Sequence, residues 1–196
     1  MTESNQLYTG LSQAAWGYFF LTFDFNLGTV SVLPRFVGFY LLFSAIGKLS
    51  MERRDLNLLR PLCILLTGWS GMDWLLSWRG GDIEGHILFL DLLVTVVTLY
   101  FHFQFLTDMS ALAEAYQPDD DSLSGRIRSH RTAYTLIVTA IALLDTLSQV
   151  FPWEWWPGII VFAALITCIV ALMIMSDLFR LRRCVRNGGT ELPGAH

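Results

Sequence analysis

The sequence predicts an all-α integral membrane protein, a helical bundle of six transmembrane helices arranged in three hairpins. Of its 196 residues, 54% are hydrophobic and only 15% are charged, whereas soluble domains carry about 25% charged residues. Its long apolar runs, such as LLVTVVTLYFHFQFL, do not alternate apolar and polar positions as membrane β-strands do. This composition excludes a disordered chain, a nucleic-acid-binding domain and a disulfide scaffold.

The lengths of the apolar segments define the expected helices. A helix needs about 20 apolar residues to cross the hydrocarbon core, and four segments have this length: 58–78, 87–107, 133–151 and 159–179. Two shorter segments, 11–26 and 34–49, correspond to about 24 Å of helix each. We expect both to span the membrane, and a re-entrant hairpin is the alternative. Together the six form one membrane domain over 1–187, followed by a flexible cytoplasmic tail over 188–196.

The positive charges predict the orientation of the chain. Eleven of the thirteen Lys and Arg residues follow the second, fourth and sixth expected helices, and the other two are Arg35 and Arg79. Cytoplasmic loops carry the excess of positive charge in membrane proteins, so both termini are expected in the cytoplasm. Five tryptophans mark the opposite helix ends, where their rings suit the membrane interface: Trp74, Trp78, Trp153, Trp155 and Trp156.

One connector, residues 108–132, is longer than the others. Pro118 is expected to stop the fourth helix, and Asp121 or Ser122 to cap the fifth, because acidic charge suits a helix N-terminus. Residues 109–116 could lie along the inner membrane surface as a short amphipathic helix.

Four aspartates in the outer part of the expected helices form the candidate polar or ion site: Asp24, Asp73, Asp91 and Asp145. Ionisable groups inside a membrane span are costly and mark ion or proton sites. The alternative, favoured by their shallow depth, is that they pair with Arg35 and Arg79 or reach interfacial water. Asp24, Asp73 and Asp145 also recur at similar places in the three hairpins, as in an internal repeat.

The run Gly68-Trp69-Ser70-Gly71 resembles the GxSG motif around the nucleophile of rhomboid intramembrane proteases. A serine nucleophile needs a base within hydrogen-bond reach. The nearest candidate, His102, is expected at a depth that differs from that of Ser70 by about 10 Å. The arrangement departs from the rhomboid pattern, and small residues that allow close helix packing are the alternative explanation.

A second resemblance covers about 15 residues and follows the pattern N-x-G, a short apolar run and L-P-x-F-x-G. It falls on Asn26, Gly28, Leu33, Pro34, Phe36, Gly38 and Phe39. This segment resembles one found in small uncharacterised bacterial multi-span membrane proteins, which implies a bacterial plasma membrane and carries no activity. Physically, the motif indicates a tight turn, a helix that begins with Pro34, and a Gly38 that admits a close neighbour.

The expected function is that of a non-enzymatic packing, interaction or sensing component of the membrane. The alternatives are a small cation- or proton-linked transporter or channel using the aspartates, and, more distantly, an intramembrane serine hydrolase. No cofactor, metal or nucleic acid is expected, and Cys63, Cys168 and Cys184 are interpreted as reduced thiols. The expected partners are the lipid bilayer and anionic headgroups on the basic side, with a second copy or another membrane protein left open.

Overall fold

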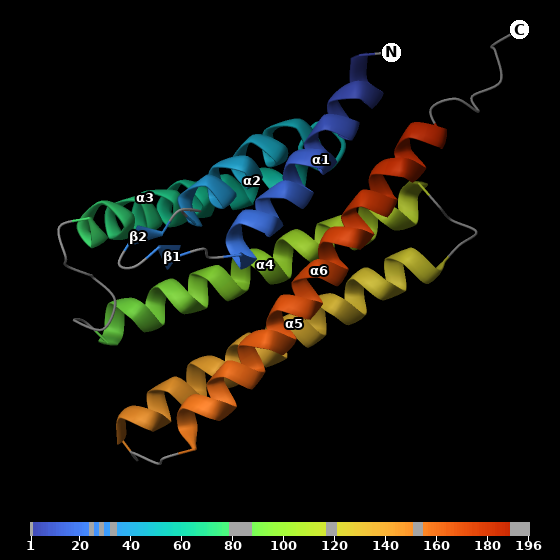
Figure 1. The fold of residues 1–196 in the computed structure, drawn as a ribbon. Coiled ribbons are helices and arrows are strands. Elements are labelled where there is room, and N and C mark those ends of the chain that lie inside the picture. The colour runs from blue at the N-terminus through green and yellow to red at the C-terminus, as the bar shows by residue number, and fades with distance from the viewer. Residues whose placement is uncertain are drawn as a thin grey trace, which may run out of the picture.

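The computed structural model describes residues 2–23, 26–27, 30–31, 35–78, 88–116, 121–150 and 155–188. These residues form six α-helices (Figure 1): α1 (Thr2–Thr22), α2 (Arg35–Leu49), α3 (Arg60–Ser77), α4 (Leu88–Tyr116), α5 (Asp121–Val150) and α6 (Trp156–Gly188). A 3₁₀ helix, η1 (Arg54–Leu59), leads into α3. Two short strands, β1 (Asn26–Leu27) and β2 (Val30–Ser31), pair antiparallel. The predicted helical class is confirmed.

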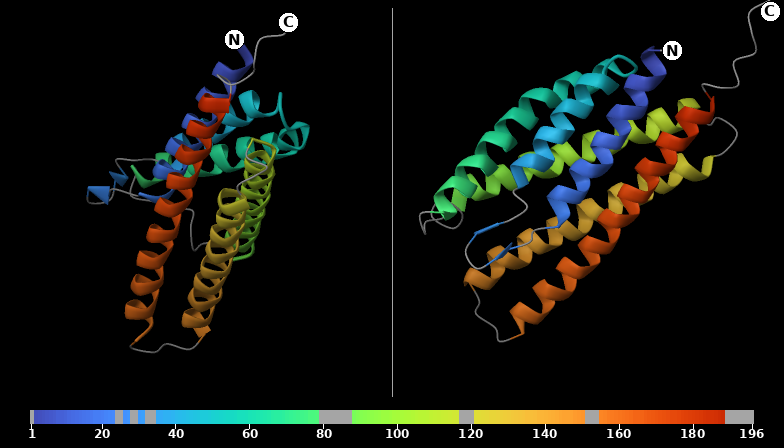
Figure 2. Two further views of the ribbon diagram at one scale, coloured as in Figure 1. Left: turned by 90° about the vertical axis from the view of Figure 1, so that its right-hand side faces the viewer. Right: turned by 45° about the horizontal axis from the view of Figure 1, so that its top comes forward.

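The helices form an open ring in the order α3, α2, α1, α6, α5 and α4. Each helix in this order packs against the next, whereas α3 and α4 contact each other only lightly. The first and third expected hairpins, α1 with α2 and α5 with α6, are therefore closely packed pairs. The middle pair is not, because α3 packs mainly on α2, and α4 on α5 (Figures 1 and 2).

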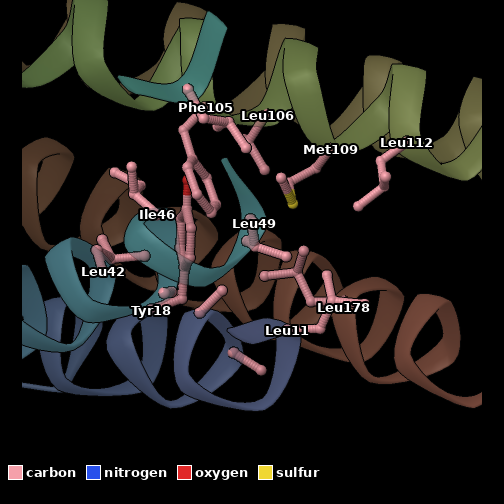
Figure 3. Packing of buried hydrophobic residues seen from close by; sticks show 14 of the residues in the cluster. Leu11, Tyr18, Leu42, Ile46, Leu49, Phe105, Leu106, Met109, Leu112 and Leu178 are labelled. Carbon is pink, nitrogen blue, oxygen red and sulfur yellow. The ribbon is translucent and has the colours of Figure 1, made fainter. Parts of the chain in front are cut away.

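The hydrophobic core lies at one end of this ring, which we call the packed end. The N-terminal end of α1 and the C-terminal end of α6 both lie there (Figure 1). The core joins all six helices and η1, and its large buried side chains include Leu11, Tyr18, Leu42, Ile46, Leu49, Phe105, Leu106, Met109, Leu112 and Leu178 (Figure 3). Among the residues described within 67–100 and 128–169, none is buried. The opposite end, which we call the open end, is therefore much less closely packed.

Several helices extend beyond their expected bounds at the packed end. The apolar residues Met109, Leu112 and Ala113 continue the helical spacing of α4 and are buried in the core. Burial of these apolar side chains against other helices stabilises the extension. The expectation of a surface-lying amphipathic helix over 109–116 is therefore wrong. Similarly, α1 begins at Thr2 rather than 11, because Leu7 joins the same core.

The fifth helix runs from Asp121 to Val150, so both residues expected to cap it, Asp121 and Ser122, lie within the helix itself. Its first turns contain the arginines that were expected in a loop before residue 133. Leu123 and Ile127 on these turns are buried, which explains why the segment is helical. The sixth helix likewise continues past 179 to Gly188, with Leu181 and Val185 buried.

Helices α1 and α2 cross at two glycines. A Cβ atom added to Gly38 would lie 2.9 Å from the carbonyl oxygen of Gly17 and 2.7 Å from Leu21 Cγ. A Cβ atom added to Gly17 would lie 3.1 Å from the carbonyl oxygen of Gly38. The two backbones therefore touch at a point where only glycine fits. Of the other motif residues, Asn26 pairs with Ser31, whereas Gly28 and Pro34 lie outside the described residues.

Within the described residues, two helices are long and apolar enough to cross a membrane, over Leu90–Tyr116 in α4 and Gly158–Arg186 in α6. Large apolar side chains are also exposed along α3 to α6, among them Leu65, Leu75, Leu92, Val96, Leu136, Leu143, Val161, Phe162, Leu165 and Ile169. Exposed apolar surface on this scale marks a membrane or protein contact.

Candidate functional site

A cavity of about 390 Å³ lies next to the core, on the side of the open end. Its size falls within the range of small-molecule sites, about 300–1,000 Å³. All six α-helices contribute to its lining, with polar groups from each: Thr22, Arg35, Ser70, His102, Tyr134 and Thr167. The cavity is therefore a property of the whole ring.

His102 of α4 is one of the residues that line this cavity. The side chain is only 3% exposed, and its Nδ1 lies 3.1 Å from the hydroxyl of Tyr18, which comes from α1. The imidazole ring also meets the ring of Tyr134 from α5, edge to face, with 5.3 Å between the ring centroids. Three helices thus fix the position of one buried imidazole.

The Tyr18 contact also fixes the proton on this imidazole. Tyr18 is 1% exposed, and His102 is its one hydrogen-bond partner through the hydroxyl in the described part of the chain. A buried hydroxyl that donates nothing loses a hydrogen bond, so we assign the Tyr18 hydroxyl as the donor and Nδ1 as the acceptor. The neutral imidazole then carries its proton on Nε2. With this assignment, Nε2–H is the imidazole group that can still donate a hydrogen bond.

The one charged side chain among the described lining residues is Arg35, the first residue of α2. Tyr134 of α5 lines the same cavity. No Asp or Glu lies among the lining residues within the described part of the chain. Arg35, His102 and Tyr134 thus form a group of donors, which we call the donor cluster.

Apolar side chains line much of the remaining wall. Val94 lies on α4, Val138 and Ile141 lie on α5, and Ala164 lies on α6. Cys168, one helical turn beyond Ala164, also lines the cavity and forms no disulfide. The cavity therefore combines a polar, donor-rich part with an apolar part.

The structure does not bring the candidate aspartates into this cavity. Asp73 and Asp91 are half-buried and Asp145 is exposed, and none of the three lines it. Each of them has an interaction partner. Asp24 lies outside the described residues. A shared aspartate site therefore stays a prediction, separate from the cavity.

Ser70 and His102 line the same cavity, although the sequence placed them at different depths. No hydrogen bond joins them in the described chain, and Nδ1 of His102 is occupied by Tyr18. The suggestion that the glycines beside Ser70 allow close packing is wrong. A Cβ atom on Gly68 or Gly71 would meet nothing within 4 Å, because this part of α3 lies in the open half of the ring.

Sequence reasoning missed a buried acidic residue at the packed end. Asp177 of α6 is 0% exposed, and its Oδ2 lies 2.7 Å from Nδ1 of His130 on α5. Nη2 of Arg126, four residues before His130, lies 3.0 Å from Oδ1. Oδ1 accepts no hydrogen bond in the described chain, so the Arg126 contact is an ion pair only. The signal in the sequence was the spacing of four, which places Arg126 and His130 on one helix face.

Within the described ranges, no group of three or more His, Cys, Asp or Glu side chains could hold a metal ion. No family model, curated protein or solved structure matches this chain. What the chain does is therefore indicated by its own surface, cavity and packing.

Proposed function

We propose that this chain is a six-span integral membrane protein whose central cavity binds a small lipid-soluble molecule. It then acts by binding, as a sensing or interaction component, rather than by catalysis. One observation carries the proposal: all six helices line a single cavity in the half of the molecule whose outer surface is apolar.

The exposed surface supports the membrane assignment. Apolar side chains such as Leu92, Phe162 and Leu165 are exposed on helices that meet the length of a span. In water such a surface would drive association, whereas in lipid it needs no cover. The open half of the ring then lies within the bilayer, with its exposed apolar side chains in contact with lipid.

The cavity also supports six crossings. Helices α4 and α6 are long and apolar enough to span by themselves. The other four reach the same cavity from the same packed end, through Thr22, Arg35, Ser70 and Tyr134. α2 has 15 residues, about 22 Å of helix, so its crossing would need a locally thin bilayer. The N-terminal end of α1 and the C-terminal end of α6 share one end of the molecule (Figure 1), which fits both termini in the cytoplasm.

The lining chemistry favours a bound molecule that is not a cation. A cation site needs oxygen ligands with negative charge, and the described lining carries Arg35 and no carboxylate. A hydrolase would need Ser70 beside a base, and the one buried imidazole is held by Tyr18. These features favour binding over the transport and hydrolase alternatives.

The native thiol of Cys168 gives a direct test. In a protein with Cys63→Ala and Cys184→Ser, held in lipid nanodiscs, Cys168 is the remaining cysteine. We expect it to react with methyl methanethiosulfonate, a small uncharged reagent, because it lines the cavity. Ala164→Trp should fill the cavity and largely abolish the reaction.

Ala140→Trp is the matched control, because Ala140 is exposed on α5 and is not among the lining residues. This variant should leave the rate of Cys168 modification unchanged. An unreactive Cys168, or a rate that Ala164→Trp does not lower, would overturn the proposed cavity.

A further inference from the structure

The class of molecule that this cavity takes follows from its donor cluster, provided that the proposed function holds. Every strongly polar group of the cluster can donate a hydrogen bond: Arg35 by its guanidinium, His102 by Nε2–H and Tyr134 by its hydroxyl. A guanidinium has five N–H donors, so a contact between Arg35 and another group leaves donors for a ligand. The cluster calls for a ligand group that accepts several hydrogen bonds.

The charge of the cluster narrows the choice of acceptor. Arg35 is the one charged residue among the described lining. A guanidinium binds a carboxylate through two parallel hydrogen bonds, which a single carbonyl oxygen cannot match. A carboxylate therefore uses the cluster better than a neutral carbonyl does.

The remaining wall suits a hydrocarbon chain. Val94, Val138, Ile141 and Ala164 are apolar and lie on three helices around the cavity. A chain placed against them would make dispersion contacts and keep water out. The volume of about 390 Å³ limits the occupant to a small molecule.

We propose that the cavity binds a lipid-soluble monocarboxylate, an acyl chain with one carboxylate head. The carboxylate lies on Arg35, His102 and Tyr134, and the chain lies along the apolar wall. His102 contributes its Nε2–H, and the contact between the Tyr18 hydroxyl and Nδ1 holds the imidazole ring in place. This assigns to the donor cluster a specific role in recognising an anionic head.

Protection of Cys168 from modification tests this proposal with three probes of equal chain length. The single-cysteine protein in nanodiscs is treated with methyl methanethiosulfonate in the presence of octanoate, methyl octanoate or octylamine. We expect octanoate to slow the reaction and octylamine to leave it unchanged. A protein with Cys184 alone, which does not line the cavity, should react at one rate with every probe.

Two substitutions locate the binding to the donor cluster. Arg35→Gln removes the charge and should weaken octanoate protection by about tenfold or more. Tyr134→Phe keeps the ring, removes the hydroxyl and should weaken it several-fold. Arg60→Gln is the matched control, because Arg60 is likewise the first residue of a helix and is not part of the lining.

The possible failures are distinguishable. Equal protection by octanoate and octylamine, or an octanoate effect that survives Arg35→Gln, would overturn the anionic class while leaving the cavity itself in place. If methyl octanoate protected Cys168 as well as octanoate does, the cluster would recognise a neutral carbonyl group and not specifically a carboxylate. If no probe protects and Ala164→Trp also leaves Cys168 reactive, the proposed function fails as well.

Discussion

At the scale of single residues, two buried polar contacts join helices that are far apart in the sequence. Tyr18 and His102 join α1 to α4, and Asp177 joins α6 to Arg126 and His130 of α5. A buried polar group without its partner costs about 1–3 kcal/mol. Each contact therefore stabilises this arrangement of the helices over others that would leave the same groups unpaired.

The substitution Tyr18→Phe should destabilise the fold by about 1–3 kcal/mol, because Nδ1 of the buried His102 loses its donor. Denaturant unfolding in a mild detergent would measure this change in free energy. Tyr40→Phe on α2 is the control, because Tyr40 is 61% exposed, and it should change the stability by less than about 0.5 kcal/mol. Equal stabilities for the two variants would contradict the role of the Tyr18 hydroxyl.

Replacing Asp177 with Asn should also destabilise the fold, by about 1–3 kcal/mol, since the buried contact with His130 is weakened and Arg126 loses its counter-charge. The loss stays below that of a fully buried pair because Arg126 is partly exposed. The thermal midpoint of the purified protein checks this. Asp145→Asn should lower the midpoint much less, because Asp145 is exposed and an exposed carboxylate contributes little through its contacts. A similar fall in both variants would refute the account.

At the scale of the elements, the crossing of α1 and α2 depends on contact between their backbones. Gly17 and Gly38 lie opposite each other. A Cβ atom on Gly38 would lie 2.9 Å from the carbonyl oxygen of Gly17, closer than Cβ atoms come in proteins, and one on Gly17 would make a tight contact of 3.1 Å with that of Gly38. The same helix α2 contains Gly47, where an added Cβ atom meets nothing within 4 Å. The two glycines of α2 thus differ only in their surroundings.

Gly38→Ala should therefore destabilise the protein by about 1–3 kcal/mol through steric overlap, whereas Gly47→Ala should be neutral or stabilise by up to about 1 kcal/mol, because alanine favours the helix. Unfolding of the two variants under identical conditions gives the comparison. If Gly38→Ala were as stable as Gly47→Ala, the close crossing would be wrong.

The sequence predicted the helices well and their ends less well. Apolar runs such as 87–107 locate a helix, because a continuous apolar segment of this length is long enough to cross the hydrocarbon core. The ends were misplaced at the packed end, where Leu7, Met109 and Leu181 continue the helical spacing outside the expected spans and are buried. The length of an apolar run does not predict these buried residues, because they lie beyond the ends of the expected spans.

The candidate site was harder to predict than the fold. His102 and Ser70 were both noticed, yet their meeting in one cavity depends on how six helices pack. Arg35 was considered only as a partner for aspartates, and its place in the cavity lining beside Tyr134 was not foreseen. The spacing of residues within one helix cannot predict a site to which each of the six helices contributes only a few residues.

At the scale of the whole molecule, the ring is closely packed at one end and open at the other. The packed end carries the N-terminal end of α1, the C-terminal end of α6 and the fully buried core. The open end carries the cavity and the exposed apolar side chains. We infer that the packed end faces the cytoplasm, where the positive charges gather, and that the cavity lies in the outer half of the bilayer.

Labelling of single cysteines from outside intact cells tests the six crossings most directly. In a background without native cysteines, Thr29→Cys, Asp82→Cys and Glu154→Cys should react with a membrane-impermeant maleimide, whereas Asp55→Cys and Ser129→Cys should react only after the cells are opened. The account predicts this pattern because the helix ends on either side of residues 29, 82 and 154 lie toward the open end. A shielded Thr29→Cys would mean that α1 and α2 re-enter rather than span, and the reversed pattern would contradict the orientation altogether.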